Sequence, residues 1–303
     1  MKKITQICFI LILSIVCLFN QQIATFGQEQ SNNIINYYTN IIKSDPNNYE
    51  AYNNRGVEKY KLKDYQGALN DYNASIRINP KSYQPYYSRG VVKSDLKDYQ
   101  GALNDYNIAI KLNPNFYLAY NNIGFVKLKL QDYSGAIQAF DKTIKLNPNF
   151  YLAYYNRGRI KDITKDYNGA LDDYSATIKL NSNIYQAYYD RGRVYFALKK
   201  YQEAINDNLK VIQLNPNFPD AYNNIGFIKY ELKDYKNAIK YFNKAIELNP
   251  NHEGAFYSRA IAKEKIKDYS GALNDYIMAL KLNPNYIDMG ITDKIKELKN
   301  YKK

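Results

Sequence analysis

The sequence contains very little of the side-chain chemistry on which most enzymes depend. Its 303 residues include one histidine, His252, two cysteines and no tryptophan. Nucleophilic catalysis needs an activating base, and a zinc site needs several nitrogen or sulfur ligands. A single histidine in the loop after Pro250 is far more often solvated than catalytic, and no phosphate-binding loop of the form G-x-x-x-x-G-K occurs. We therefore expect no enzymatic activity, no cofactor and no metal.

Cysteine is absent beyond the first 27 residues, because both cysteines, Cys8 and Cys17, lie within them. These residues begin with a basic pair and continue with an apolar run over residues 7–19, a pattern that predicts a secretory signal peptide over residues 1–27. The alternative is an uncleaved membrane anchor, although about 20 apolar residues are needed to span a bilayer. A mature chain without cysteine suits an oxidising compartment. We expect an exported protein, whether periplasmic, in the cell envelope or extracellular, with membrane attachment only if the segment is uncleaved.

A linker is also missing, because no stretch rich in Gly, Ser or Pro interrupts residues 49–286. Instead, a unit of 34 residues recurs seven times over this span without insertion. In the copy at residues 117–150, apolar residues recur at steps of three and four on both sides of Asp132, which predicts two helices. Asp132 is placed to cap the second helix, and Asn147-Pro148 ends it. Helices this short are marginal in isolation, so each unit must pack on its neighbours.

The landmarks of this unit keep their register in all seven copies. An aromatic residue early in the first helix is followed four residues later by a small one, and an alanine marks the second helix. The aromatic set is Tyr52, Tyr86, Tyr120, Tyr154, Tyr188, Tyr222 and Phe256, and the small set is Gly56, Gly90, Gly124, Gly158, Gly192, Gly226 and Ala260. A proline closes every copy except the one with Ser182. In these features the chain resembles the tetratricopeptide repeat family. The resemblance implies an all-α fold, a right-handed α-solenoid of seven tandem 34-residue helix-turn-helix repeats with N- and C-terminal capping helices.

The repeat phase also predicts how the chain is divided. After the signal peptide we expect an N-terminal linker and capping helix at 28–48, and a C-terminal capping helix at 287–303. The seven repeats occupy residues 49–82, 83–116, 117–150, 151–184, 185–218, 219–252 and 253–286. A solenoid needs such ends, because an open repeat would expose its stacking surface. Since the period is unbroken, we expect one elongated domain.

Two charged positions change together among the repeats, counting each repeat from its first residue. Five repeats carry arginine at position 7 and aspartate sixteen residues later: Arg55 with Asp71, Arg89 with Asp105, Arg157 with Asp173, Arg191 with Asp207 and Arg259 with Asp275. The other two lack both, with Ile123 and Ala139 or Ile225 and Tyr241. This predicts an ion pair between the two helices of a repeat, the alternative being solvated charges copied by duplication. Lysine at position 11 of six repeats is expected to lay its stem over the helix pair while its ammonium reaches water.

Because the sequence predicts no catalytic or metal site, we expect the function to depend on a binding surface. The family resemblance implies that the first helices line a concave groove that holds a peptide, with contacts from positions that include 5, 6 and 9. Carried over onto this chain, the candidate residues are Asn53, Asn54, Tyr87, Asn121, Asn122, Phe125, Tyr155, Asn156, Arg159, Tyr189, Asp190, Arg193, Asn223, Asn224, Phe227 and Tyr257. Amides bond a peptide backbone, and tyrosine supplies rigid contact area. Arg159 and Arg193 are neighbours in mid-groove and could grip a carboxylate. The lysine and asparagine clamp that relatives use for acidic chaperone tails is missing, so we do not predict that ligand.

The sequence therefore predicts a non-enzymatic protein-interaction scaffold or adaptor that binds a peptide or partner protein, without specific nucleic-acid binding. The simplest competing view is that asparagine and tyrosine serve only solubility. A second function is open, since the net charge is +13 and lysines recur in the turns and late in the second helices. Such rows are usually solvated faces, but they could bind an anionic polymer or a membrane surface. The exposed tyrosines also leave self-association open.

Overall fold

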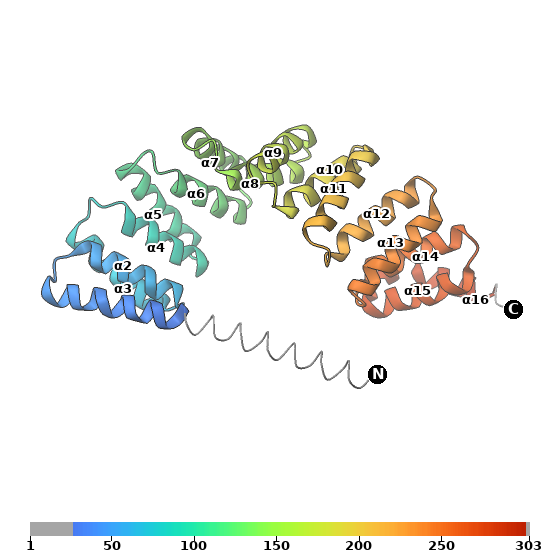
Figure 1. Ribbon diagram of the computed structural model, residues 1–303, viewed down its shortest axis with the longest axis horizontal. Helices are drawn as coiled ribbons and strands as arrows, with labels where there is room; N and C mark the ends of the chain where they lie inside the picture. The colour runs from blue at the N-terminus through green and yellow to red at the C-terminus, as the bar shows by residue number, and fades with distance from the viewer. Residues whose placement is uncertain (1–26, 301–303) are drawn as a thin grey trace. The chain divides into compact units, whose positions relative to one another are not determined.

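The structure is a computed structural model in which residues 27–300 are described (Figure 1). The predicted signal peptide lies outside this part of the chain, apart from its last residue. Between residues 27 and 300 the regular structure is entirely helical, as the sequence predicts. Over the same residues, no helix is both long enough and apolar enough to cross a membrane.

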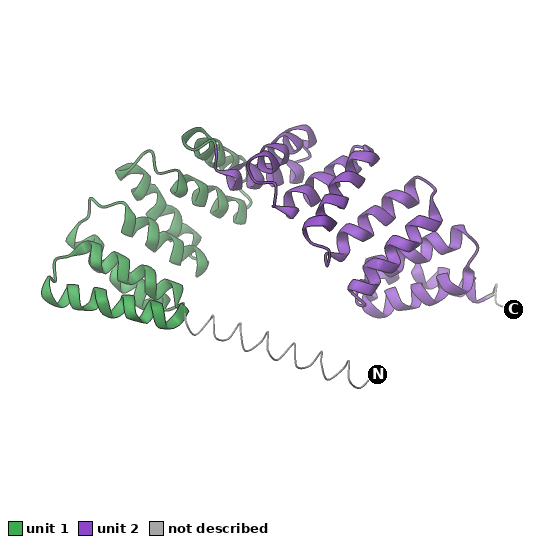
Figure 2. Ribbon diagram, in the orientation of Figure 1, with its two compact units in different colours: residues 1–148 green, residues 149–303 purple. Residues whose placement is uncertain are grey.

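The helices follow one another as packed antiparallel pairs, and the first and second helix of each pair are called helix A and helix B below. The pairs are α2 (Tyr49–Lys61) with α3 (Tyr65–Ile78), α4 (Gln84–Asp95) with α5 (Tyr99–Leu112), α6 (Tyr117–Lys129) with α7 (Tyr133–Leu146), α8 (Tyr151–Ile163) with α9 (Tyr167–Leu180), α10 (Tyr185–Ala197) with α11 (Tyr201–Leu214), α12 (Pro219–Glu231) with α13 (Tyr235–Leu248), and α14 (Glu253–Lys265) with α15 (Tyr269–Leu282). Where the period alone suggests one domain, the contacts group the chain into two compact units that meet in sequence at Pro148 and Asn149 (Figure 2). Helices α2 to α7 belong to the first unit and α8 to α16 to the second.

The turn inside each pair is set by two adjacent residues. The first has a positive φ, such as 64° at Lys97, which is the left-handed conformation that ends helix A. The second is usually an aspartate that caps helix B, and the cap predicted at Asp132 is confirmed, since its Oδ1 accepts from the Gly135 amide at 2.9 Å. Helix α11 is the exception, because Lys200 at its N-cap makes no side-chain bond to the first turn.

The core of most pairs is built where a helix B ring lies on a small residue of helix A, which is glycine in all but the last pair. A Cβ added at Gly90 would lie 2.7 Å from Tyr106 Cε1, so only glycine admits the ring at this distance. The helix B residues in this register are Tyr72, Tyr106, Phe140, Tyr174, Asn208, Phe242 and Tyr276. All six aromatic members are at most 2% exposed. Asn208, opposite Gly192 in the α10–α11 pair, is the one member without a ring.

The ion pair predicted within five repeats is confirmed in every one of them. Each arginine binds its aspartate through two parallel hydrogen bonds, with Nε–Oδ2 distances of 2.7 to 2.9 Å and Nη2–Oδ1 distances of 2.5 to 2.7 Å. The aspartates are buried, and the arginines are less than one-fifth exposed. In at least four of these repeats the second guanidinium arm also reaches the preceding helix, as when Arg89 Nη1 donates to Asn73 Oδ1 at 2.7 Å. The pairs therefore join helices within and between repeats.

The expectation for lysine at position 11 is wrong in one respect, because its ammonium is not simply directed to water. Lys93 Nζ lies 2.8 Å from Asp105 Oδ2, and three other repeats with the aspartate show the same contact. Where the aspartate is missing, the lysine turns to the helix B cap, as Lys127 does toward Asp132 at 2.8 Å. The lysine therefore pairs with the buried aspartate of helix B where the repeat has one, and with the exposed cap aspartate where it does not.

Additional helices adjoin the first and last pairs. Helical backbone at 27–44 adjoins α2, where Ser31 Oγ donates to Glu58 Oε2 at 3.1 Å and Thr39 Oγ1 accepts from Arg55. After α15 the chain forms a 3-10 helix, η1 (Pro284–Met289), and then α16 (Ile291–Asn300). The helix expected from residue 287 thus begins later, because Gly290, at φ 74°, interrupts it. In α16, Ile291 and Leu298 are buried against α15.

Candidate functional site

The candidate residues of the first unit largely bond one another. Asn53 Nδ2 donates to Asn54 Oδ1 in α2, and Asn121 Nδ2 donates to Asn122 Oδ1 in α6, both at 3.2 Å. Asn122 Nδ2 also donates to Tyr87 Oη of α4 at 3.2 Å. The bond from Asn122 to Tyr87 joins α6 to α4, so part of the row that sequence assigns to a ligand stabilises the stack.

Candidate residues of the first unit are accessible to a ligand at two positions along this row. Asn53 and Asn54 line a small pocket of about 160 Å³ with Ser82 and Gln84. Phe125 is 41% exposed, with the ammonium of Lys129 lying 5.3 Å from its ring centre. Neither place brings together more than two of the candidate residues.

The second unit holds a denser cluster between α8 and α10. Tyr155 Oη donates to Asp190 Oδ2 at 2.8 Å, and Arg193 Nη1 lies 3.8 Å from Asp190 Oδ1. Asp190 is mostly buried, and burial raises the pKa of its carboxyl against the opposing effect of the Tyr155 hydrogen bond and Arg193. Arg159 is exposed, and its guanidinium carbon lies 5.9 Å from the centre of the Tyr155 ring. The arginines expected to grip a carboxylate thus stand beside an acid of the chain itself.

A pocket of about 570 Å³ opens at this cluster. Its walls carry Tyr155, Arg159, Asp162, Ile163, Lys165, Tyr167, Tyr174, Asp190 and Arg193. Tyr174 is fully buried, and its hydroxyl has no hydrogen-bond partner within the described chain. Burial raises the pKa of Tyr174 and of Tyr155, so both phenols stay protonated and can donate a hydrogen bond.

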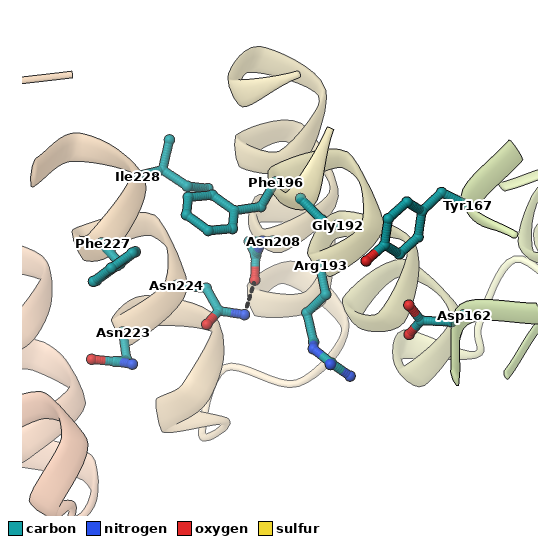
Figure 3. A pocket seen from close by; sticks show the side chains of 11 residues that line it. Asp162, Tyr167, Gly192, Arg193, Phe196, Asn208, Asn223, Asn224, Phe227 and Ile228 are labelled. Carbon is teal, nitrogen blue, oxygen red and sulfur yellow. Dashed lines mark hydrogen bonds between the residues drawn. The ribbon is translucent and has the colours of Figure 1, made fainter. Parts of the chain in front are cut away.

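A second pocket, of about 320 Å³, adjoins the first and reaches α12 (Figure 3). It shares Asp162, Tyr167 and Arg193 with the larger pocket. Its remaining walls are Gly192, Phe196, Ala197, Asn208, Asn223, Asn224, Phe227 and Ile228. Figure 3 shows Tyr167 and Asp162 on one side of it, the phenylalanines on the other, and Asn208 and Asn224 turned toward each other. Asn224 Nδ2 donates to Asn208 Oδ1 at 3.4 Å, whereas Asn223 Oδ1 is buried without a partner within residues 27–300.

The structure thus brings seven candidate residues to two adjoining pockets. They are Tyr155, Arg159, Asp190, Arg193, Asn223, Asn224 and Phe227. Three others in this unit lie outside the pocket walls. Asn156 is half-buried in α8, the Tyr189 ring makes an edge contact with Phe218 at 5.1 Å, and Tyr257 stacks on Tyr286 at 4.9 Å.

Ten residues of these pocket walls are not among the sequence candidates, and they include Asp162, Tyr167, Phe196 and Asn208. Asp162 and Phe196 both occupy position 12 of their repeats, which belongs to the groove pattern of the family but carries no shared residue type here. Tyr167 and Asn208 come from helices B, which that pattern does not include. The only available signal was Asn208 itself, a polar residue in an otherwise aromatic register.

The lone histidine is a structural residue and not the solvated one expected. His252 is the N-cap of α14, and its Nδ1 accepts from the Ala255 amide at 3.3 Å. Its Nε2 lies 3.1 Å from Asp220 Oδ1, and only 12% of the side chain is exposed. In the described part of the chain, no cluster of three or more His, Cys, Asp or Glu is placed to hold a metal ion.

Known proteins with similar sequences and structures agree with this architecture. The family model described as the tetratricopeptide repeat matches residues 49–82, 117–150 and 219–252, and a second model described as TPR repeat matches residues 93–131 and 192–233. Together these segments cover about half of the chain. No curated protein matches it.

Several solved structures share the fold. The chain is 28% identical to MamA with a TM-score of 0.52, over 53% of this chain and 94% of that one. It is 22% identical to YrrB, described as a TPR protein with an unusual peptide-binding site, with a TM-score of 0.57 over 62% and 97% of the two chains. The C-terminal part of a TPR repeat-containing protein from Cytophaga hutchinsonii is 19% identical with a TM-score of 0.67, over 79% and 98%.

The matched repeats and the similar structures support a role as a protein-interaction scaffold. Proteins with this fold are typically scaffolds and not enzymes. The helix pairs, the matched repeat models and the similar structures lead to one conclusion: the chain belongs to the tetratricopeptide repeat family.

Proposed function

We propose that the protein is a non-enzymatic scaffold that binds a peptide, or an extended segment of a partner protein, along helices α8, α10 and α12. The observation that carries the proposal is the pair of adjoining pockets that share Asp162, Tyr167 and Arg193. Their walls combine aromatic rings with amides, phenols and guanidinium groups, a mixture suited to apolar side chains and a peptide backbone.

The surface is also held in place before any ligand arrives. Tyr155 is fixed by its hydrogen bond to Asp190, and Asn208 is fixed by its hydrogen bond to the Ala204 carbonyl. A preformed surface loses less conformational entropy on binding than a mobile one. Arg159, exposed and without an ion pair to any described residue, supplies positive charge at the edge that Asp162 and Asp190 offset only in part.

A pulldown from cell-envelope extract tests the proposal with an Arg159→Glu, Arg193→Glu double variant. We expect the variant to lose partners that the unaltered chain retains. The matched control is Lys111→Glu with Lys145→Glu, which makes the same change in net charge on exposed positions of α5 and α7. Equal capture by the unaltered chain and the arginine variant would remove the pockets from the proposal.

The second candidate function is binding of an anionic polymer or membrane surface through lysines. It is favoured by the net charge of +13 and by exposed turn lysines such as Lys97 and Lys165. Salt separates the two functions, because affinity carried by lysines falls steeply with ionic strength, whereas affinity carried by amides and rings changes little.

We also propose that the chain is exported and that its first 27 residues are removed. The basic start and the apolar run at residues 7–19 support this. Mass spectrometry of the protein recovered from a cell fraction gives its N-terminus directly. An intact Met1 in a membrane fraction would favour the anchor, and an intact Met1 in the cytoplasm would exclude export.

A further inference from the structure

The α10–α11 pair lacks an aromatic ring that every other pair supplies for itself. Six pairs set a buried Tyr or Phe of helix B against a small residue of helix A, as Phe242 does against Gly226. In the α10–α11 pair, the residue opposite Gly192 is Asn208, whose Nδ2 would lie 3.0 Å from a Cβ added at the glycine. A short amide thus stands where a ring would otherwise close the interior.

Asn208 is held at the bottom of this space and cannot swing out to fill it. It is 1% exposed, and its Nδ2 donates to the Ala204 carbonyl at 2.8 Å. Its Oδ1 faces Asn224 Nδ2 at 3.4 Å, a long bond that another donor could replace. The floor of the pocket is therefore polar and able to bond the hydroxyl of an entering phenol.

The walls of the same pocket are shaped for a ring. Phe196 and Phe227 meet edge to face at 5.5 Å, and Phe227 is 37% exposed at the surface. Aromatic rings favour such edge contacts, so a third ring placed here would bury apolar area and form favourable edge-to-face contacts with both phenylalanines. A volume of about 320 Å³ is at the lower end of the roughly 300 to 1,000 Å³ found for ligand sites.

Positive charge and an unused donor lie next to this space. Arg193 borders both pockets, and Arg159 is exposed in the adjoining one. There the Tyr174 hydroxyl is buried without a partner. Asp162 and Asp190 offset part of this charge, and Arg159 also acts electrostatically on Asp190, but its guanidinium forms no ion pair with any described residue and is exposed to a ligand.

We propose that the pocket over Gly192 binds an aromatic side chain of the partner peptide, which occupies the position of the ring that α11 lacks. An acidic residue of the same peptide, close in sequence to the aromatic one, then faces Arg159. This inference rests on the proposed function and names the chemistry of its ligand. The occupant belongs to a partner, since six of the seven pairs fill the equivalent space with a ring of their own and only this pair leaves it open.

The test uses a phage-displayed library of randomised peptides, about nine residues long, selected on the full chain. We expect the selected peptides to share one Tyr, Phe or Trp with an Asp or Glu nearby. The decisive variant is Asn208→Tyr, which restores the ring found in the other pairs. We expect this variant to melt at or above the temperature of the unaltered chain and to bind the selected peptide about 10- to 100-fold more weakly.

The matched control is Phe242→Tyr, which changes the same register in the α12–α13 pair and leaves the pocket alone. It should bind the peptide with unaltered affinity. Because Tyr stands in this register in four other pairs, both variants are expected to fold. If Asn208→Tyr nevertheless unfolds, Phe227→Ala provides a second variant, and it should also weaken binding at least fivefold.

The possible outcomes separate the two proposals. Selected peptides without an aromatic residue, or with equal affinity for the Asn208→Tyr variant, would overturn the aromatic site and leave the scaffold intact. A library that yields no binder to the unaltered chain would overturn the scaffold and the site together. Sedimentation that shows a dimer abolished by Asn208→Tyr would assign the pocket to a second copy of this chain and overturn the peptide ligand.

Discussion

Arg89 of α4 and Asp105 of α5 are joined by two parallel hydrogen bonds, 2.9 Å between Nε and Oδ2 and 2.6 Å between Nη2 and Oδ1. Lys93 adds a third contact to Oδ2 at 2.8 Å. The hydrogen bond to Asp105 raises the pKa of Arg89 despite the opposing effect of burial. One buried carboxylate thus holds two cations of helix A on helix B.

Replacing Asp105 with alanine should lower the free energy of unfolding by about 2 to 4 kcal/mol, because two half-buried cations lose their partner. Asp105→Asn should cost less, since its amide oxygen can still accept. Urea unfolding followed by circular dichroism measures both. The control is Glu247→Gln, which removes an exposed contact to Lys244 and should leave the midpoint unchanged. An unaltered midpoint in Asp105→Ala would show that the pair contributes nothing.

Two equivalent glycines should respond differently to alanine. A Cβ at Gly226 would lie 2.7 Å from the Phe242 ring and 3.2 Å from the Ala238 carbonyl oxygen, a backbone atom that cannot easily move. At Gly192 the nearest atoms are Asn208 Nδ2 at 3.0 Å and Asp207 Cβ at 3.3 Å. We expect Gly226→Ala to cost about 1 to 3 kcal/mol and Gly192→Ala clearly less. If thermal unfolding showed an equal loss of stability in the two variants, the helix B ring would not control the spacing of the two helices.

Asp190 should make stability depend on pH in the acid range. Burial raises its pKa above the ordinary 3.8 in the folded chain, so the folded state favours the protonated form. The stability it contributes is therefore fully present below pH 3.8 and is lost as pH rises through the raised value. The groups that face it are Tyr155, Arg193, Arg159 and Asp162.

Asp190→Asn removes this titration while Tyr155 can still donate to the amide oxygen. The variant should gain stability relative to the unaltered chain as pH rises from about 3.8 to 7, measured as the difference in melting temperature. A difference that stays constant over this range would show that Asp190 keeps its ordinary pKa in the fold.

The helix pairs and the ion pairs could be predicted from the sequence, but the pockets could not. A helix cap such as Asp132 and the paired changes at Arg89 and Asp105 depend on neighbours at fixed spacing, so seven copies of one unit reveal them. The smaller pocket exists because one repeat has no aromatic ring in the register of Asn208. In the sequence, Asn208 is indistinguishable from an ordinary polar substitution. Only the structure shows that it lines a pocket with Gly192 and Phe227. Space between helices is a property of the packed pair and carries no periodic signal.

Two tyrosines of one unit provide the last comparison, because the same substitution removes a bonded hydroxyl in one and an unbonded hydroxyl in the other. Tyr155 Oη donates to Asp190, whereas Tyr174 Oη is buried with no partner in the described chain. Tyr155→Phe should therefore cost about 1 to 2 kcal/mol, since a mostly buried carboxyl loses its donor. Tyr174→Phe should be neutral or stabilise by up to about 1 kcal/mol, since an unsatisfied polar group disappears. The same Tyr174→Phe variant should weaken binding of a selected peptide if that hydroxyl serves the ligand. Destabilisation by Tyr174→Phe equal to that of Tyr155→Phe would mean that the Tyr174 hydroxyl already has a partner within the fold.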